Sequence, residues 1–122
     1  MLDSELQGLC LYWQRELRLQ DWDITAKFGI PIGASDACVN PSENGMCAEI
    51  IVMSTLNQKA RHTKLIGEPD GVEIDLVHEL LEIMFNALRR EVDMDCKDYR
   101  FEQNYNRLAK ALVKLKNSNA GQ

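Results

Sequence analysis

Residues 72–90 constrain the fold most, because their apolar side chains recur at the spacing of one helix face. The apolar stripe consists of Val77, Leu81, Met84 and Leu88, and it is widened by Leu76, Leu80, Ile83 and Ala87. At about 100° per residue, the polar side chains gather on the opposite side of the helix. These polar residues are Asp75, His78, Glu79, Glu82 and Asn86. We predict an amphipathic helix whose apolar stripe packs against the rest of the fold.

Two further amphipathic helices are predicted, one toward each end of the sequence. The first covers residues 2 to about 20, and either Asp3 or Ser4 is its expected N-cap. Its apolar side chains are Leu6, Leu9, Trp13 and Leu17. The second covers residues 99 to about 117. Its apolar stripe comprises Phe101, Tyr105, Leu108, Leu112 and Leu115, continued by Ala109 and Val113.

Three strands are predicted between the first two helices. Residues 22–28 alternate apolar and polar side chains, as a strand with one buried face does. Residues 34–39 form a short second strand, and turn-forming residues at 40–45 connect it to a third strand at 46–53. The third strand carries apolar side chains on both faces, which predicts a strand covered on both sides or nearly so. Residues 57–70 are expected to form an exposed loop. The order of elements predicts an α+β fold in which helices pack on a small three-stranded sheet.

The sequence as a whole predicts a single domain over residues 1–122, because this length suits one hydrophobic core. The formal charge of −5 argues against a nucleic-acid partner, which normally needs a basic face. No apolar run approaches the roughly 20 residues of a membrane span. Acids near the N-terminus stand where a secretory signal carries lysine or arginine. We therefore expect a cytoplasmic protein with no membrane partner.

The cysteines offer two interpretations. Cys10, Cys38, Cys47 and Cys96 form no CxxC pair, so a zinc ribbon is not expected. In a reducing compartment cysteines usually behave as small buried hydrophobic residues, and this interpretation is favoured. A disulfide between Cys38 and Cys47, across two neighbouring strands, is the alternative.

The polar face of the helix at residues 72–90 carries a candidate metal site. His78 and Glu82 are four residues apart, so their side chains lie one turn apart on the same face and can meet on one cation. Glu79 lies beside them, where it can reach a water on that cation. The HExxH helix of zinc peptidases has this geometry, and here the pattern is HExxE. Carboxylates also ligate zinc, and they admit manganese or iron more readily. The alternative is an ordinary solvated helix face.

Glu102 is a second unusual acid, because it lies on the flank of an apolar stripe. Its neighbours on the helical wheel are Tyr105, Ala109 and Val113, whereas the lysines lie elsewhere. A carboxylate turned toward a core needs a cation or strong hydrogen bonds. Glu102 therefore either extends its carboxylate to solvent or pairs with an arginine or lysine, or it is a third metal ligand beside His78 and Glu82.

Four motifs follow the order and spacing of a known family. They are LQDWDI at residues 19–24, an A-x-I-x-V strand at 48–52, VHELLE at 77–82, and NRLAKAL at 106–112 with Glu102 before it. Over about residues 9–115 the sequence resembles the small zincin-like metallopeptidases of phages and prophages. Where the family has VHELLH, this chain has Glu82 in place of the second histidine.

The resemblance implies a minimal zincin-like fold, in which an edge strand beside the metal helix receives an extended peptide. His78 would then ligate zinc, Glu79 would act as general base, and Glu102 would be the third ligand. The expected cofactor is zinc, or manganese or another divalent cation, and the expected partner is a peptide or protein substrate. The cytoplasm of a bacterial host is the expected location.

Three hypotheses therefore remain open from the sequence. The chain is a metal-dependent peptidase with a variant site, or it is a catalytically inactive zincin-fold module for binding or assembly. A weaker third hypothesis assigns Asp75, His78 and Glu82 to a structural cation. The remaining histidine, His62, is expected to be a surface residue and not a ligand.

Overall fold

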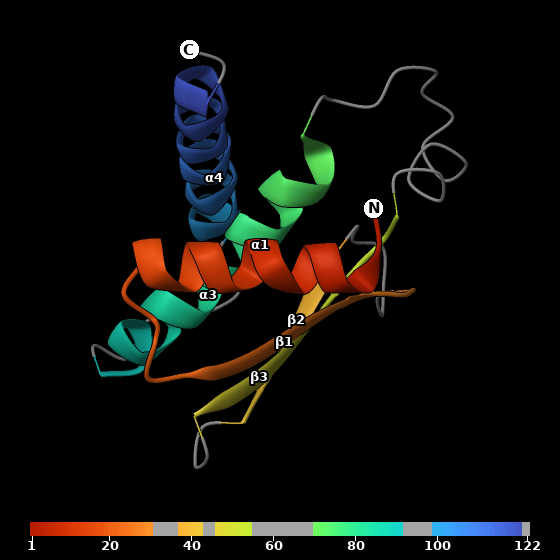
Figure 1. Ribbon diagram of the computed structural model, residues 1–122. Helices are drawn as coiled ribbons and strands as arrows, with labels where there is room; N and C mark the ends of the chain where they lie inside the picture. The colour runs from red at the N-terminus through yellow and green to blue at the C-terminus, as the bar shows by residue number, and fades with distance from the viewer. Residues whose placement is uncertain (31–36, 43–45, 55–69, 92–98, 121–122) are drawn as a thin grey trace.

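The computed structural model describes residues 1–30, 37–42, 46–54, 70–91 and 99–120, and it confirms the α+β class (Figure 1). The elements are α1 (Asp3–Glu16), β1 (Asp23–Phe28), β2 (Ala37–Ser42), β3 (Cys47–Val52), α3 (Gly71–Glu91) and α4 (Tyr99–Ala120). None of these helices is long and apolar enough to cross a membrane. The predicted loop at 57–70 lies outside the described residues, except for Asp70.

The strands lie in the order β1-β3-β2. β1 runs parallel to β3, and β2 runs antiparallel to it. The prediction that β2 would end at residue 39 is wrong, because the strand continues through Pro41 and Ser42. A proline is tolerated there because β2 is an edge strand, where a missing N–H group can face away from the ladder.

β1 and β3 bury the same face, while the other face of β3 is exposed at Cys47 and only partly covered at Glu49 and Ile51, so the expected cover of both faces is incomplete. Ile24 and Ala26 of β1 pair with Ala48 and Ile50 of β3, and all four side chains are buried. On the opposite face Cys47 is exposed. Lys27 and Glu49 form an ion pair of 3.4 Å there, with both side chains about half exposed. The helices α1 and α3 contribute to the same core as the buried face, so the fold has two layers.

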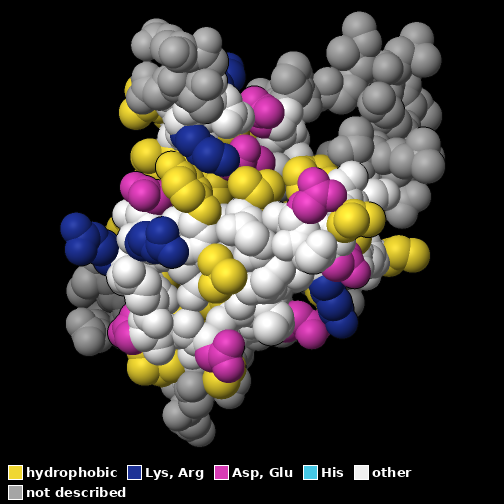
Figure 2. Space-filling model, in the orientation of Figure 1, with side chains coloured by type: hydrophobic (Ala, Val, Ile, Leu, Met, Phe, Trp, Pro, Cys, Tyr) yellow, Lys and Arg dark blue, Asp and Glu magenta, His cyan; other side chains and the backbone are white. Residues whose placement is uncertain are grey.

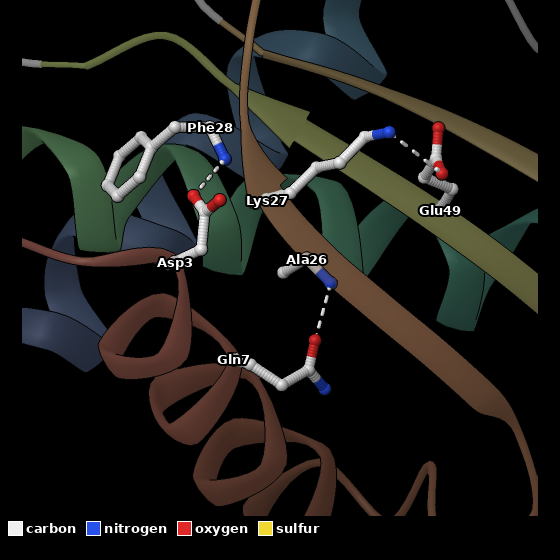
Figure 3. Close-up of polar contacts among 6 residues, drawn as sticks. All are labelled: Asp3, Gln7, Ala26, Lys27, Phe28 and Glu49. Carbon is white, nitrogen blue, oxygen red and sulfur yellow. Dashed lines mark hydrogen bonds and ion pairs between the residues drawn. The ribbon is translucent and has the colours of Figure 1, made fainter.

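Side chains from α1 occupy the outer edge of β1 (Figure 3). Gln7 Oε1 accepts a hydrogen bond from the Ala26 N–H at 2.7 Å, and Gln7 Nε2 donates to the Ile24 carbonyl at 3.1 Å. Asp3 Oδ1 accepts from the Phe28 N–H at 3.0 Å. The N-cap of α1 is Leu2, so the prediction that Asp3 or Ser4 would cap the helix is wrong. These contacts protect the β1 edge from pairing with another strand.

The first helix ends at Glu16, earlier than predicted. Arg18 adopts a left-handed conformation with φ 61°, which a helix cannot continue. The Leu19 N–H then donates to the Gln14 carbonyl at 2.7 Å and closes the last turn. This reversal places Leu19 in the core with 6% of its surface exposed.

A largely buried ion pair joins α1, α3 and α4. Glu73, in the first turn of α3, accepts a hydrogen bond from Trp13 Nε1 at 2.7 Å and pairs with Lys116 Nζ of α4 at 2.6 Å. The Lys116 ammonium also lies 4.8 Å from the centroid of the Tyr12 ring. These contacts fix the start of α3 against α1 and against the last part of α4.

The predicted apolar stripe of α4 is confirmed in part. Tyr105, Ala109 and Val113 are buried, whereas Leu108 and Leu115 are exposed. α4 packs mainly on α3 and lies farther from the sheet than α1 and α3 do (Figure 1). Its buried side chains join the common core, and near its start Tyr105 and Glu102 contact His78 of α3.

The disulfide alternative is wrong. Cys38 pairs in register with Ile51, whereas Cys47 pairs with Ser42, so the two cysteines lie near opposite ends of the β2–β3 ladder. At about 3.3 Å per residue, four residues separate them by roughly 13 Å, beyond disulfide reach. Cys47 is in no disulfide and is exposed, which corrects the expectation of a buried cysteine at this position. Cys10 is buried as expected, and its burial raises the pKa of the thiol to about 11. Cys96 lies outside the described residues.

Candidate metal centre

The helix α3 brings His78, Glu79 and Glu82 together on its polar face. One ligand atom from each side chain lies within 4.8 Å of the others, which is close enough for a single cation. His78 Nε2 lies 3.7 Å from Glu82 Oε1, as expected for residues four apart in a helix. Asp75 is not a member of this group, so the hypothesis of an Asp75, His78 and Glu82 cation site loses its geometric basis.

The group is mostly shielded from solvent, so the solvated-face interpretation of α3 is wrong. Glu79 has only 7% of its surface exposed. The exposed fractions of the His78 and Glu82 side chains are 17% and 23%. The acids of this face therefore lie where carboxylates need a cation or hydrogen bonds to offset the loss of hydration.

Glu102 approaches this group from α4. Its Oε2 atom lies 2.9 Å from His78 Nε2, while its side chain remains 42% exposed. The residue that the sequence placed on the flank of an apolar stripe thus faces the HExxE helix and pairs with its histidine. All four predicted site residues are brought together, with Glu79 as the most buried and Glu102 as the most exposed.

The pKa values of the group reflect the crowding of acids around one imidazole. Burial would lower the pKa of His78, but hydrogen bonds and Coulomb attraction from Glu82 and Glu102 raise it above its ordinary value. Burial also opposes ionisation of Glu82, yet hydrogen bonds with His78, Glu102 and Glu79 lower its pKa to about 2. For Glu102, burial, its hydrogen bond with Glu82 and repulsion from that acid raise the pKa, and His78 opposes this. The surrounding acids thus favour the protonated form of His78, while the imidazole favours the ionised form of Glu82.

Two aromatic residues border the site, and the sequence did not indicate their role. Tyr105, expected to be a core residue, is buried, and its ring meets the His78 ring edge-to-face with centroids 5.9 Å apart. Phe85 stacks on Tyr105 at the same centroid distance. The sequence did offer one indication that Tyr105 lies near the site. It follows Glu102 by three residues, which puts both side chains on one side of α4.

The candidate donors are one imidazole nitrogen and three carboxylates. Because carboxylates favour harder cations than imidazoles do, this set suits a harder divalent cation than a site with two histidines would. The four donors come from two helices that the structure holds together. His62, the other histidine, lies outside the described residues, as does the side chain of Asn86. Comparisons with protein-family models, with curated proteins and with solved structures found no significant match.

Proposed function

We propose that this chain is a metal-dependent peptidase with a variant zincin-type site. The observation that carries the proposal is the grouping of His78, Glu79 and Glu82 within reach of one cation, mostly shielded from solvent, with Glu102 Oε2 2.9 Å from His78 Nε2. His78, Glu82 and Glu102 would hold the cation, and Glu79 would remain beside it. The donor chemistry fits zinc, and it fits manganese or iron better than a two-histidine site does.

The residues divide the chemistry between them. A bound divalent cation would polarise the scissile carbonyl and lower the pKa of a neighbouring water. Glu79 takes one proton from that water as the oxygen bonds to the carbonyl carbon. Glu79 then returns the proton to the amine nitrogen as the carbon–nitrogen bond breaks. Its burial supports this role, because it holds the carboxylate beside the cation site and away from bulk solvent.

The position of a peptide substrate follows from the edges of the sheet. Gln7 and Asp3 already satisfy backbone groups on the outer edge of β1. β2 is the other edge strand, and it also lies against α3. An extended peptide would therefore add beside β2, where main-chain hydrogen bonds supply affinity.

A cytoplasmic location, in a bacterial host if the chain derives from a phage, belongs to the same proposal.

A second candidate function is a catalytically inactive module that keeps this fold for binding or assembly. The observation that favours it is the 2.9 Å contact between His78 and Glu102, because these groups already satisfy each other. Replacing the missing histidine with Glu82→His distinguishes the two. If the chain is an inactive module, the native protein should bind no zinc and Glu82→His should bind it strongly. If the chain is a peptidase with a variant site, the native protein should already bind metal.

The proposal is tested by metal content and by cleavage. Protein purified without chelator and incubated with zinc or manganese should retain about one equivalent, measured by elemental analysis. His78→Ala should lose it, and His62→Ala is the matched control that should keep it. Glu79→Gln should keep the metal but lose cleavage of an unfolded protein substrate. Absence of metal from the native chain under both conditions overturns the proposal.

A further inference from the structure

Three rings stand in a row beside the metal-site residues. The Phe85 and Tyr105 rings are stacked with an interplanar angle of 15°, and the Tyr105 and His78 rings meet at 78°. Both centroid distances are 5.9 Å, within the range in which aromatic pairs attract each other. Phe85 and His78 belong to α3, whereas Tyr105 belongs to α4, so the tyrosine ring lies between side chains of the opposite helix.

The helix α4 therefore contacts the imidazole of His78 in two ways. Glu102 binds its Nε2 atom, and Tyr105, three residues later on the same helix, packs against its ring. Tyr105 has 4% of its surface exposed, so its ring has little freedom to move away. These contacts matter because the ring torsion of histidine is broad and roughly two-fold. Without a packing partner the imidazole can turn either nitrogen toward the acids.

We infer that Tyr105 is a positioning residue, whose ring holds the His78 imidazole so that Nε2 faces Glu82 and Glu102. Phe85 supports the tyrosine from its other side. The consequence for metal binding rests on the proposed function, but the ring orientation is a property of the chain without metal. Removing an outer-shell group that orients a metal ligand by a hydrogen bond typically costs about 10- to 100-fold in metal affinity, and we expect loss of the orienting Tyr105 ring to fall in the same range.

The orientation is tested first without metal, by nitrogen NMR of the His78 ring. The chain has two histidines, so a His62→Gln background leaves one imidazole to observe. At alkaline pH, where Glu102 is ionised, a held ring carries its proton on Nε2, because only that tautomer donates to the carboxylate. The native chain and Tyr105→Phe should show this single tautomer. Tyr105→Leu should show averaged signals from both nitrogens.

The consequence is tested second, by zinc and manganese titrations of the same variants. Tyr105→Leu should bind metal about 10- to 100-fold more weakly, while Tyr105→Phe should stay within about threefold of the native chain. Val113→Ala is the control, because it removes a buried side chain from the same helix away from the site. It should lower the melting temperature and leave the affinity of the folded protein unchanged.

The outcomes separate the inference from the proposed function. A single native-like tautomer in Tyr105→Leu overturns the positioning role, as does loss of that tautomer in Tyr105→Phe. If the native chain binds neither metal, the proposed function fails, and the tautomer measurement alone decides the inference. Equal affinity losses in Tyr105→Leu and Val113→Ala would also overturn it, because they would reflect general damage to α4.

Discussion

Neutralising Glu73 should destabilise the fold far more than neutralising an acid on the surface. Its side chain is 8% exposed, and its carboxylate meets both Trp13 Nε1 and Lys116 Nζ at hydrogen-bond distance. Glu73→Gln keeps the shape of the side chain and an oxygen for the tryptophan. It leaves the charge of Lys116 without its partner, in a position where only 23% of that side chain is exposed.

The expected loss follows from this geometry. Removing one partner of a buried ion pair costs about 3–5 kcal/mol, because the other charge stays desolvated. The rings of Tyr12 and Trp13 near the ammonium offset part of the loss, so we expect about 3 kcal/mol. With an unfolding entropy of about 2.1 cal/mol/K per residue, this lowers the melting temperature by roughly 12 °C.

The assay is chemical and thermal unfolding followed by circular dichroism, with two reference variants. Glu49→Gln removes the acid of the exposed pair with Lys27, and it should cost about 1 kcal/mol or less. The double variant Glu73→Gln with Lys116→Met should recover most of the loss, because no unpaired buried charge remains. The reasoning is refuted if Glu73→Gln costs no more than Glu49→Gln, or if the double variant is less stable than either single one.

Three further predictions concern backbone strain, pH and metal choice. Arg18→Gly should stabilise the chain by about 1 kcal/mol in urea unfolding, because φ 61° is unfavourable for a residue with a Cβ atom; destabilisation would contradict this. At pH values below the raised pKa of His78, metal affinity should increase about tenfold for each unit by which the pH is increased, because the cation must displace one proton from the imidazole. A calorimetric titration that gives the same affinity at every pH would exclude that linkage. Glu82→His should increase affinity for zinc more than for manganese in paired titrations, and an unchanged ratio would show that Glu82 is not a ligand.

Local patterns in the sequence predicted the elements of the site well. The helical spacing of residues 72–90 predicted α3 to within one residue at each end. It also placed His78 and Glu82 together, because an (i, i+4) contact is determined within one helix. Glu102 was identified by its position on the wheel of α4, since an acid beside an apolar stripe needs a partner.

Long-range contacts were not predictable in the same way. Trp13, Glu73 and Lys116 come from three helices, and their spacing in the sequence contains no sign of their contact. The same holds for Gln7, whose side chain takes the place of a strand beside β1. The early end of α1 was missed because Arg18 occupies a left-handed position that usually carries glycine.

Anomalous diffraction from a zinc- or manganese-soaked crystal tests the central claim most directly. We predict a single strong peak about 2.0–2.2 Å from His78 Nε2 and at similar distances from Glu82 and Glu102 carboxylate oxygens. The direct hydrogen bond between His78 and Glu102 should then be replaced by coordination. A crystal in which that bond persists at 2.9 Å, with anomalous peaks absent or confined to the outer surface, would contradict the account.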